Sequence, residues 1–198
     1  MMVDLFWIIV KIIFKTRHKY IYDGLENIPK DKAVLLLGNH VSWIDWIIIQ
    51  LSIERRINFM MDREIYNWKF FNIFFKKGKA IAVSKKGSKD AFSEAYKRLK
   101  NGEVVVIFPE GGISKDGNIG KFYRGYEMIP IDYDGVIISF FIDGIFGSSL
   151  SKYKLQTKKK FYEKRKIKVY FERPLSKEIK ADELKEKIIK MKEKYEVK

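Results

Sequence analysis

The chain has 198 residues, 46% of them hydrophobic and 15% aromatic, so it is long enough for one domain with a substantial core. Its 40 lysines and arginines outnumber its 25 aspartates and glutamates, and the net charge of +15 indicates an anionic partner: nucleic acid, an anionic membrane surface or a phosphorylated substrate. The chain has no cysteine, which excludes disulfides, thiolate zinc sites and cysteine nucleophiles.

The N-terminal stretch MMVDLFWIIVKIIFKTRHKY lacks the features of a secretory signal, because Asp4 precedes its apolar run and Lys11 interrupts it. The longest uncharged run of the chain, 33–44, is shorter than the roughly 18–20 apolar residues that span a bilayer, so we expect no membrane-spanning segment. We predict that 1–22 is a segment whose short apolar helix and following cations dock on anionic membranes. The alternative is a helix packed against the protein's own core.

Beyond this segment, β-prone runs alternate with helical patterns. Strands are predicted at 33–38, at 79–83, within 102–112, and at 135–142 and 167–171. Helices are predicted at 44–53, 90–100 and 181–196. This alternation predicts a single α/β domain over 23–198, with a mixed, mostly parallel sheet flanked by helices.

The stretch LLLGNHVSWIDWIII places polar residues between two apolar runs. His40 and Asp45 are five positions apart, about 140° around a helix of 3.6 residues per turn, so they would not share a face if both were within one. The pattern fits a helix that begins between them, with Ser42 as its N-cap and the Asp45 carboxylate reaching back to the cap and to His40. The alternative is that Ser42 and Asp45 only cap the helix while His40 fills a polar gap.

A second motif, VVVIFPEGGIS, is a β-branched run that stops at Pro109 and delivers Glu110, Gly111 and Gly112 into a loop. Loops at the carboxyl edge of an α/β sheet are where ligands bind. Two glycines allow backbone N–H groups to approach a phosphate or an oxyanion closely. The same four residues, Pro-Glu-Gly-Gly, also form ordinary turns.

The order of NHVSWID and FPEGGIS resembles the glycerolipid acyltransferase superfamily of the 1-acylglycerol-3-phosphate acyltransferase type, which carries N-H-x4-D and then F-P-E-G-T-R-S. The intervening GKAIAVSKKGS is similar to the family's middle block. The resemblance runs from about Gly24 to Pro174. It implies a glycerol-3-phosphate acyltransferase-like α/β fold in which His40 is the general base, Asp45 orients it, and the FPEGGIS block helps to bind the acceptor's phosphate. It also implies no metal and no cofactor, with the thioester of acyl-CoA or acyl carrier protein as co-substrate.

Acyl transfer from a thioester to an alcohol needs a base that removes the hydroxyl proton as the oxygen attacks, and neutral imidazole suits that task near pH 7. A carboxylate that fixes the imidazole tautomer makes the pair equivalent to the histidine–aspartate half of a serine-hydrolase triad, with the substrate hydroxyl in place of serine. No covalent acyl-enzyme is then required.

The sequence departs from the family pattern at Gly112-Ile113, where the family has Thr-Arg, so the arginine that would fork onto the acceptor phosphate is missing. We expect a lysophospholipid acceptor, either 1-acylglycerol 3-phosphate, which is the default that the resemblance implies, or lysophosphatidylethanolamine, a phosphodiester for which the missing arginine matters less. FPEGGISKDGNIGKFYRG with the later GIFGSSLS is also similar to lysophospholipid-recycling modules. The predicted substrate-binding residues are Asn39, Ser42, Lys85, Lys86, Glu110, Gly111, Gly112, Lys121 and Arg124.

Two other interpretations stay open. A basic, non-enzymatic module for anionic membrane or nucleic acid is suggested by 152–173, where lysines alternate with aromatic residues. No helix-turn-helix, zinc or RNA-recognition signature accompanies it, so we expect no nucleic acid. The second is an acyltransferase fold without activity, because Ile113 stands in place of the family's recognition arginine. Both His40 and Asp45 remain, however. We expect a cytoplasmic protein, peripheral on the cytoplasmic face of the membrane.

Overall fold

The structure is a computed structural model, and it describes residues 12, 14, 16, 18–67, 80–84, 87–148, 151–153 and 165–196. Its strands are β1 (His18–Asp23), β2 (Ala33–Gly38), β3 (Ile57–Asp62), β4 (Ile81–Val83), β5 (Val104–Ile107), β6 (Gly135–Asp143) and β7 (Arg165–Phe171). Its α-helices are α2 (Asp45–Ser52), α3 (Arg63–Tyr66), α5 (Lys89–Lys100) and α6 (Ala181–Glu196), with 3-10 turns η1 (Leu25–Asn27) and η2 (Arg124–Met128).

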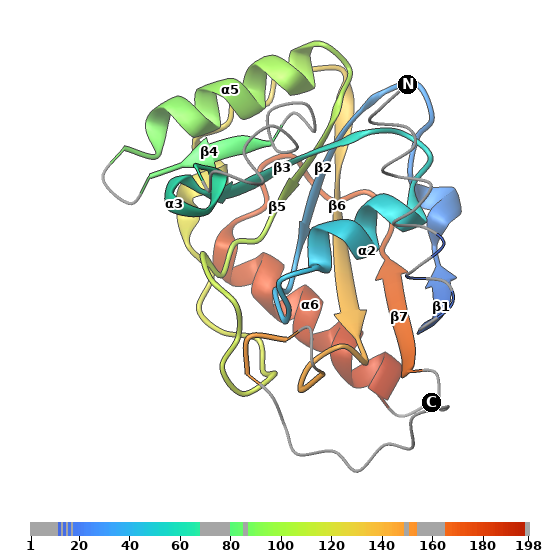
Figure 1. The fold of residues 1–198 in the computed structure, drawn as a ribbon. Helices are drawn as coiled ribbons and strands as arrows, with labels where there is room; N and C mark the ends of the chain where they lie inside the picture. The colour runs from blue at the N-terminus through green and yellow to red at the C-terminus, as the bar shows by residue number, and fades with distance from the viewer. Residues whose placement is uncertain are drawn as a thin grey trace.

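The strands form one seven-stranded sheet in the order β1-β7-β6-β2-β5-β3-β4 (Figure 1). All neighbours are parallel except β6 and β7. The central strand β2 therefore has β6 on one side and β5 on the other, and the loops that leave β2 and β5 start at the same edge of the sheet. This is the edge at which ligands bind in open α/β sheets.

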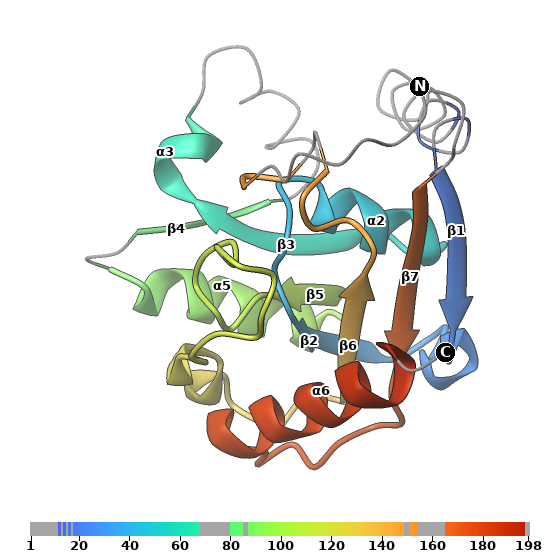
Figure 2. The same ribbon diagram turned by 90° about the horizontal axis from the view of Figure 1, so that it is seen from below.

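Helices cover both faces of the sheet: α2 lies on one face, and α5 and α6 lie on the other (Figure 2). In β2, Val34 and Leu36 pack toward α2, whereas Leu35 and Leu37 pack toward α5 and α6. All six residues of β2 are buried, as expected for a parallel strand covered on both faces. The predicted fold class, a mostly parallel mixed sheet flanked by helices, is confirmed.

The strands and helices predicted beyond residue 22 are present, with β4 shorter than expected, but β1, β3 and α3 were not predicted. Asn58 is the second residue of β3 and lies in its buried first half, where the side-chain amide donates to the carbonyl of Val104. A polar residue at this buried position interrupts the apolar pattern by which a strand is predicted. Strand β1 was assigned to the docking segment 1–22. That boundary needs correction, because His18–Asp23 pairs with β7 as an edge strand of the sheet.

Most of the predicted N-terminal apolar helix lies outside the described residues. Of the residues that are described there, Ile12 is exposed and Phe14 packs against the core cluster on the α2 side. Across the described part of the chain, no helix combines the length and the apolar character that crossing a membrane requires.

Candidate active site

His40 lies two residues beyond the carboxyl end of β2, whose last residue, Gly38, packs closely against β6. The ring of Phe140 on β6 lies where a Cβ of Gly38 would be, since a Cβ there would come within 2.3 Å of the ring. Phe140 meets the ring of Phe108 edge-on at 5.9 Å, and Phe108 stacks on the His40 imidazole at 4.2 Å and 17°. Aromatic packing therefore supports one face of the imidazole.

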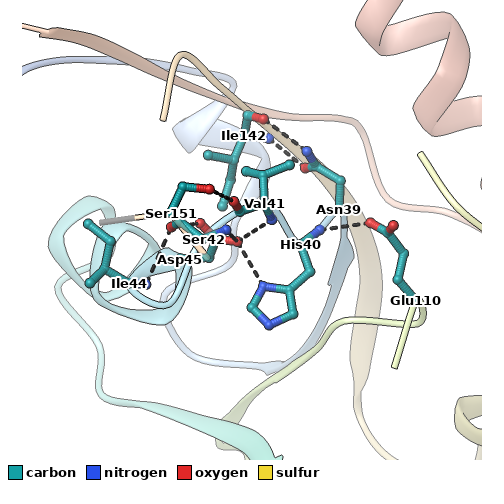
Figure 3. A network of polar contacts seen from close by, with 9 residues as sticks. All are labelled: Asn39, His40, Val41, Ser42, Ile44, Asp45, Glu110, Ile142 and Ser151. Atoms are coloured by element: carbon teal, nitrogen blue, oxygen red, sulfur yellow. Dashed lines mark hydrogen bonds and ion pairs between the residues drawn. The ribbon is translucent and has the colours of Figure 1, made fainter. Parts of the chain in front are cut away.

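The Asp45 side chain is fully buried and accepts hydrogen bonds from the turn before α2 (Figure 3). Its Oδ2 is 2.8 Å from Nδ1 of His40 and accepts the backbone N–H groups of Val41 at 2.6 Å and Ser42 at 2.9 Å. Its Oδ1 accepts the Ser42 hydroxyl. The predicted proximity of His40 and Asp45 is confirmed. Ser42 is not the N-cap, however, because α2 begins at Asp45 and its N-cap is Ile44. The Ser42 hydroxyl instead donates to the Asp45 carboxylate.

Contacts from the loop after β5 hold the peptide groups of His40. The N–H of His40 donates to Oε1 of Glu110 at 2.8 Å, and its carbonyl accepts from the N–H of Ser114 at 2.7 Å. Because the Asp45 carboxylate is an acceptor, Nδ1 of His40 is the donor, and Nε2 carries the lone pair. Among the described residues Nε2 has no hydrogen-bond partner, and the side chain is 19% exposed. The arrangement holds an imidazole firmly and leaves one basic nitrogen available.

Asn39 does not have the position of a substrate contact. Its side chain is 2% exposed, donates to the carbonyl of Ile142 at 2.9 Å and accepts the N–H of Ile142 at 2.7 Å (Figure 3). The amide thus extends the pairing of β2 with β6 beyond the last residue of β2. The prediction for Asn39 is corrected to a structural role, and the buried Ser42 shares it. Ser151, which was not predicted, holds the same turn by donating to the carbonyl of Val41 at 2.9 Å.

The loop after β5 is closed at its base. The N–H of Gly111 donates to the carbonyl of Phe108 at 3.0 Å, and the N–H of Tyr123 donates to the carbonyl of Pro109 at 2.8 Å. Gly111 has φ +64°, in the left-handed region that favours glycine. Its N–H is used inside this turn, so it is not available for the predicted contact with a phosphate or an oxyanion.

Both carboxylate oxygens of Glu110 accept backbone N–H groups, Oε1 that of His40 and Oε2 that of Gly120 at 3.0 Å. Burial raises the pKa of the Glu110 carboxyl, and the two N–H donors oppose this shift without cancelling it. Glu110 thus bridges two loops, and its predicted contact with the substrate stays a prediction.

An open pocket of about 410 Å³ is lined by Glu110 and by the loop that follows it, including Gly112, Ile113, Lys115 and Lys121. The Lys121 ammonium lies 5.7 Å from the centre of the Tyr123 ring. Arg124, in contrast, pairs with Asp182 at the start of α6, at 3.3 Å. Lys121 therefore lies at the pocket, whereas Arg124 is directed toward α6. The predicted residues Lys85 and Lys86 lie outside the described residues.

The basic stretch 152–173 is only partly described. Its last part forms β7, in which Tyr170 and Phe171 are buried in the two core clusters. These two rings are therefore not available to stack on bases, which removes part of the support for nucleic-acid binding. Within the described ranges, no cluster of three or more histidine, aspartate or glutamate side chains could hold a metal ion.

The fold and the site define a protein with a histidine–aspartate pair at the carboxyl edge of a mostly parallel sheet. A family model described as Acyltransferase matches residues 19–143, and the chain belongs to this family. A 1-acyl-sn-glycerol-3-phosphate acyltransferase of Borreliella burgdorferi is 28% identical over 147 residues, which cover 68% of this chain and 59% of the relative. One of Pseudomonas aeruginosa is 32% identical over 118 residues, covering 58% of this chain and 45% of the relative.

A lyso-ornithine lipid O-acyltransferase of Rhizobium meliloti is 27% identical over 139 residues, covering 64% of this chain and 47% of the relative. This chain thus spans about half the length of the relatives it matches. The crystal structure of the 1-acyl-sn-glycerophosphate acyltransferase from Thermotoga maritima superposes with a TM-score of 0.71 at 21% identity, covering 96% of this chain and 76% of that one. That likeness shows the fold.

Proposed function

We propose that this protein is an O-acyltransferase that moves a fatty acyl group from an acyl thioester, acyl-CoA or acyl carrier protein, to the free hydroxyl of a lysophospholipid. It would act in phospholipid synthesis or remodelling. The observation that carries the proposal is the 2.8 Å contact between Nδ1 of His40 and the buried Asp45 carboxylate, with Nε2 left without a partner among the described residues. Family membership and the names of the relatives support this reaction class.

In this reaction Asp45 holds the tautomer in which Nε2 is basic, and Nε2 removes the proton of the acceptor hydroxyl as its oxygen attacks the thioester carbonyl. The tetrahedral intermediate then expels the thiolate, and the thiolate is protonated by the imidazolium. The C–O bond of the new ester forms, the C–S bond breaks, and the free thiol leaves. The chain needs no nucleophile of its own because the acceptor supplies it.

The pocket beside the loop after β5 is the proposed place for the acceptor's headgroup. Gly112 and Ile113 leave its wall without a forked cation, and Lys115 and Lys121 supply only point charges there. The carboxylates of Glu110 and Asp116 line the same pocket, so a phosphodiester, which carries one negative charge, suits it better than a phosphomonoester, which carries up to two. We therefore propose a lysophospholipid with a substituted phosphate, such as lysophosphatidylethanolamine, ahead of 1-acylglycerol 3-phosphate.

A competition assay tests the acceptor. The protein is given an acyl thioester with equal amounts of lysophosphatidate, lysophosphatidylethanolamine and glycerol 3-phosphate, and the acylated products are quantified by mass spectrometry. We expect lysophosphatidylethanolamine to be preferred and Lys121→Ala to raise its KM about tenfold, as for the loss of one charge-assisted contact. Lys187→Ala, on the exposed face of α6, is the matched control. Exclusive use of glycerol 3-phosphate would contradict the proposed acceptor, and no acylation of any acceptor would contradict the reaction.

We also propose that the protein binds peripherally to the cytoplasmic face of an anionic membrane. In addition to the N-terminal segment, an exposed aromatic residue supports this: Trp43, in the turn between His40 and Asp45, is 46% exposed and has the Lys152 ammonium 5.7 Å from its ring. Tryptophan favours the membrane interface, and lysine is attracted to anionic headgroups. Such a pair would bring the lipid surface next to the histidine.

Flotation with vesicles tests this contact. Trp43→Ala and removal of 1–17, which spares β1, should each reduce binding to anionic vesicles several-fold, and added salt should reduce it further. Met128→Ala, an exposed apolar residue of η2, is the control for loss of exposed apolar surface. Failure of the intact protein to float with anionic vesicles at low salt would contradict membrane binding.

A further inference from the structure

The Glu110 carboxyl joins two segments that are far apart in the sequence. Its Oε1 accepts the N–H of His40 and its Oε2 accepts the N–H of Gly120 (Figure 3 shows the first contact). We infer that Glu110 is a positioning residue: it does not contact the acceptor but fixes the His40 peptide against the loop after β5, and so sets the direction in which Nε2 points. This inference rests on the proposed function.

An ionised carboxylate only accepts hydrogen bonds, and here two backbone donors meet it from opposite sides. Glu110 is partly exposed at the pocket, but each of its oxygens already accepts a backbone N–H, which favours these two contacts over a further one to a substrate hydroxyl. A phosphate would in addition be repelled by the negative charge. The geometry therefore favours a bridge over a ligand-binding group.

The same loop holds His40 on both sides of its backbone. Glu110 accepts its N–H, and the N–H of Ser114 donates to its carbonyl at 2.7 Å. The ring is fixed independently by Asp45 and by the stacked Phe108. Without Glu110 the N–H of His40 would lose its acceptor, while the ring would keep its contacts with Asp45 and Phe108. We therefore expect the imidazole to change its orientation but to stay in the site. A misplacement of about 1 Å costs on the order of 100-fold in rate.

The kinetic test uses Glu110→Gln, which keeps the size of the side chain but turns one acceptor into a donor that faces an N–H. We expect kcat to fall about 10- to 100-fold, with the KM values for thioester and acceptor within about twofold of wild type. Glu127→Gln is the matched control, because Glu127 also accepts a backbone N–H, that of Ala181 at 2.9 Å, and its contacts lie between η2 and α6. That control should leave kcat unchanged.

The spectroscopic test uses the substrate-free protein. The chain has only two histidines, His18 and His40, so His18→Gln identifies the His40 imidazole in a ¹H–¹⁵N spectrum. We expect Glu110→Gln to shift the His40 ring resonances and Glu127→Gln to leave them in place. If Glu110→Gln does not fold, Glu110→Asp, which keeps the charge but is too short to reach both donors, should give the same pattern in rate and in spectrum.

The outcomes separate the possible roles. A raised KM for the acceptor with unchanged kcat and unchanged His40 resonances would overturn the inference, because it would make Glu110 a substrate-binding residue. An equal effect of Glu127→Gln on kcat and on the resonances would also overturn it, by showing a general loss of structure. A wild-type protein that transfers no acyl group would overturn the proposed function instead, and the resonances would still decide whether Glu110 positions His40.

Discussion

The two ends of β2 and β5 are both held by side chains that bond to the backbone, but with different results. At the amino end, the Arg55 guanidinium donates to the carbonyls of Pro29 at 2.9 Å and Lys32 at 2.6 Å and to that of Gly102. At the carboxyl end, carboxylates and an amide hold the turn that carries His40. The contacts of Arg55, Asn39 and Glu110 join segments distant in sequence, whereas that of Asp45 with Val41 is local.

The difference lies in what remains unbonded. The guanidinium of Arg55 has only donors, and its contacts satisfy carbonyls that precede the strands, so Arg55 offers no acceptor for a substrate proton. At the other end the Asn39 amide and the Asp45 and Glu110 carboxylates are bonded, whereas the described residues offer no partner to Nε2 of His40. A reactive group in this fold is thus one that its neighbours fix in place but do not satisfy. The following predictions test that distinction.

The largest expected effect is that of His40→Ala. Without the imidazole no base removes the proton of the acceptor hydroxyl, so we expect acyl transfer to fall by about four orders of magnitude or more. The free energy of unfolding should stay within about 1 kcal/mol of wild type, because the side chain is partly exposed. Activity is measured with a long-chain acyl thioester and a lysophospholipid, and stability by urea unfolding. Turnover near the wild-type rate would exclude His40 as the base.

Asp45→Asn should lower kcat by about three orders of magnitude, because the amide favours the wrong imidazole tautomer and presents a donor to the N–H groups of Val41 and Ser42. Asp62→Asn is the control for the charge change, since Asp62 also accepts a backbone N–H at a helix start but on α3. An equal loss of activity in both variants would show that the effect is not specific to the site.

Arg55→Met should have the opposite profile. Hydrogen bonds from a charged group are worth about 1.5–3 kcal/mol each, but this site is partly exposed, so we expect the free energy of unfolding to fall by about 2–4 kcal/mol in total. The kcat of the folded variant should not change. Arg173→Met, at an exposed arginine, should change stability by less than about 0.5 kcal/mol. If Arg55→Met instead lowered kcat at unchanged stability, the two ends of the strands would not differ as described.

The smallest effect expected is on the pH dependence of stability. Arginine side chains in general do not lose their proton at ordinary pH values, whereas burial raises the pKa of Glu110 above its ordinary value of 4.5. The Glu110 carboxyl thus binds its proton more tightly in the folded protein than in the unfolded chain. Protonation of Glu110 therefore contributes its full stabilisation below pH 4.5, and this stabilisation is lost as the pH rises through the raised pKa.

Glu110→Gln removes this titration. The stability of wild type relative to Glu110→Gln should therefore fall as the pH rises from about 4 toward neutrality, whereas the relative stability of Arg55→Met should stay constant. Urea unfolding at a series of pH values measures both. A relative stability of Glu110→Gln that does not vary with pH, or one that varies in the opposite direction, would contradict the raised pKa.

Much of the fold could be predicted because burial leaves a direct pattern in the sequence. Strand β2 is apolar throughout since both of its faces are covered, and α5 shows its buried positions at helical spacing. The His40–Asp45 pair could also be predicted, because both residues lie in one short turn. Strand β3 could not be predicted, since Asn58 interrupts its pattern and finds its partners, Glu103 and Val104, only in the folded sheet.

By itself, the sequence determined the α/β class, the turn that carries His40 and Asp45, and the absence of the forked arginine at Ile113. These depend on local spacing and residue type. Only the tertiary structure decided which polar residues are available. Asn39 is taken up by Ile142, Glu110 by His40 and Gly120, and Arg124 by Asp182. The physical reason is that a polar side chain in a folded protein bonds to whichever donor or acceptor the fold brings near, and for these residues the partner comes from a distant part of the chain.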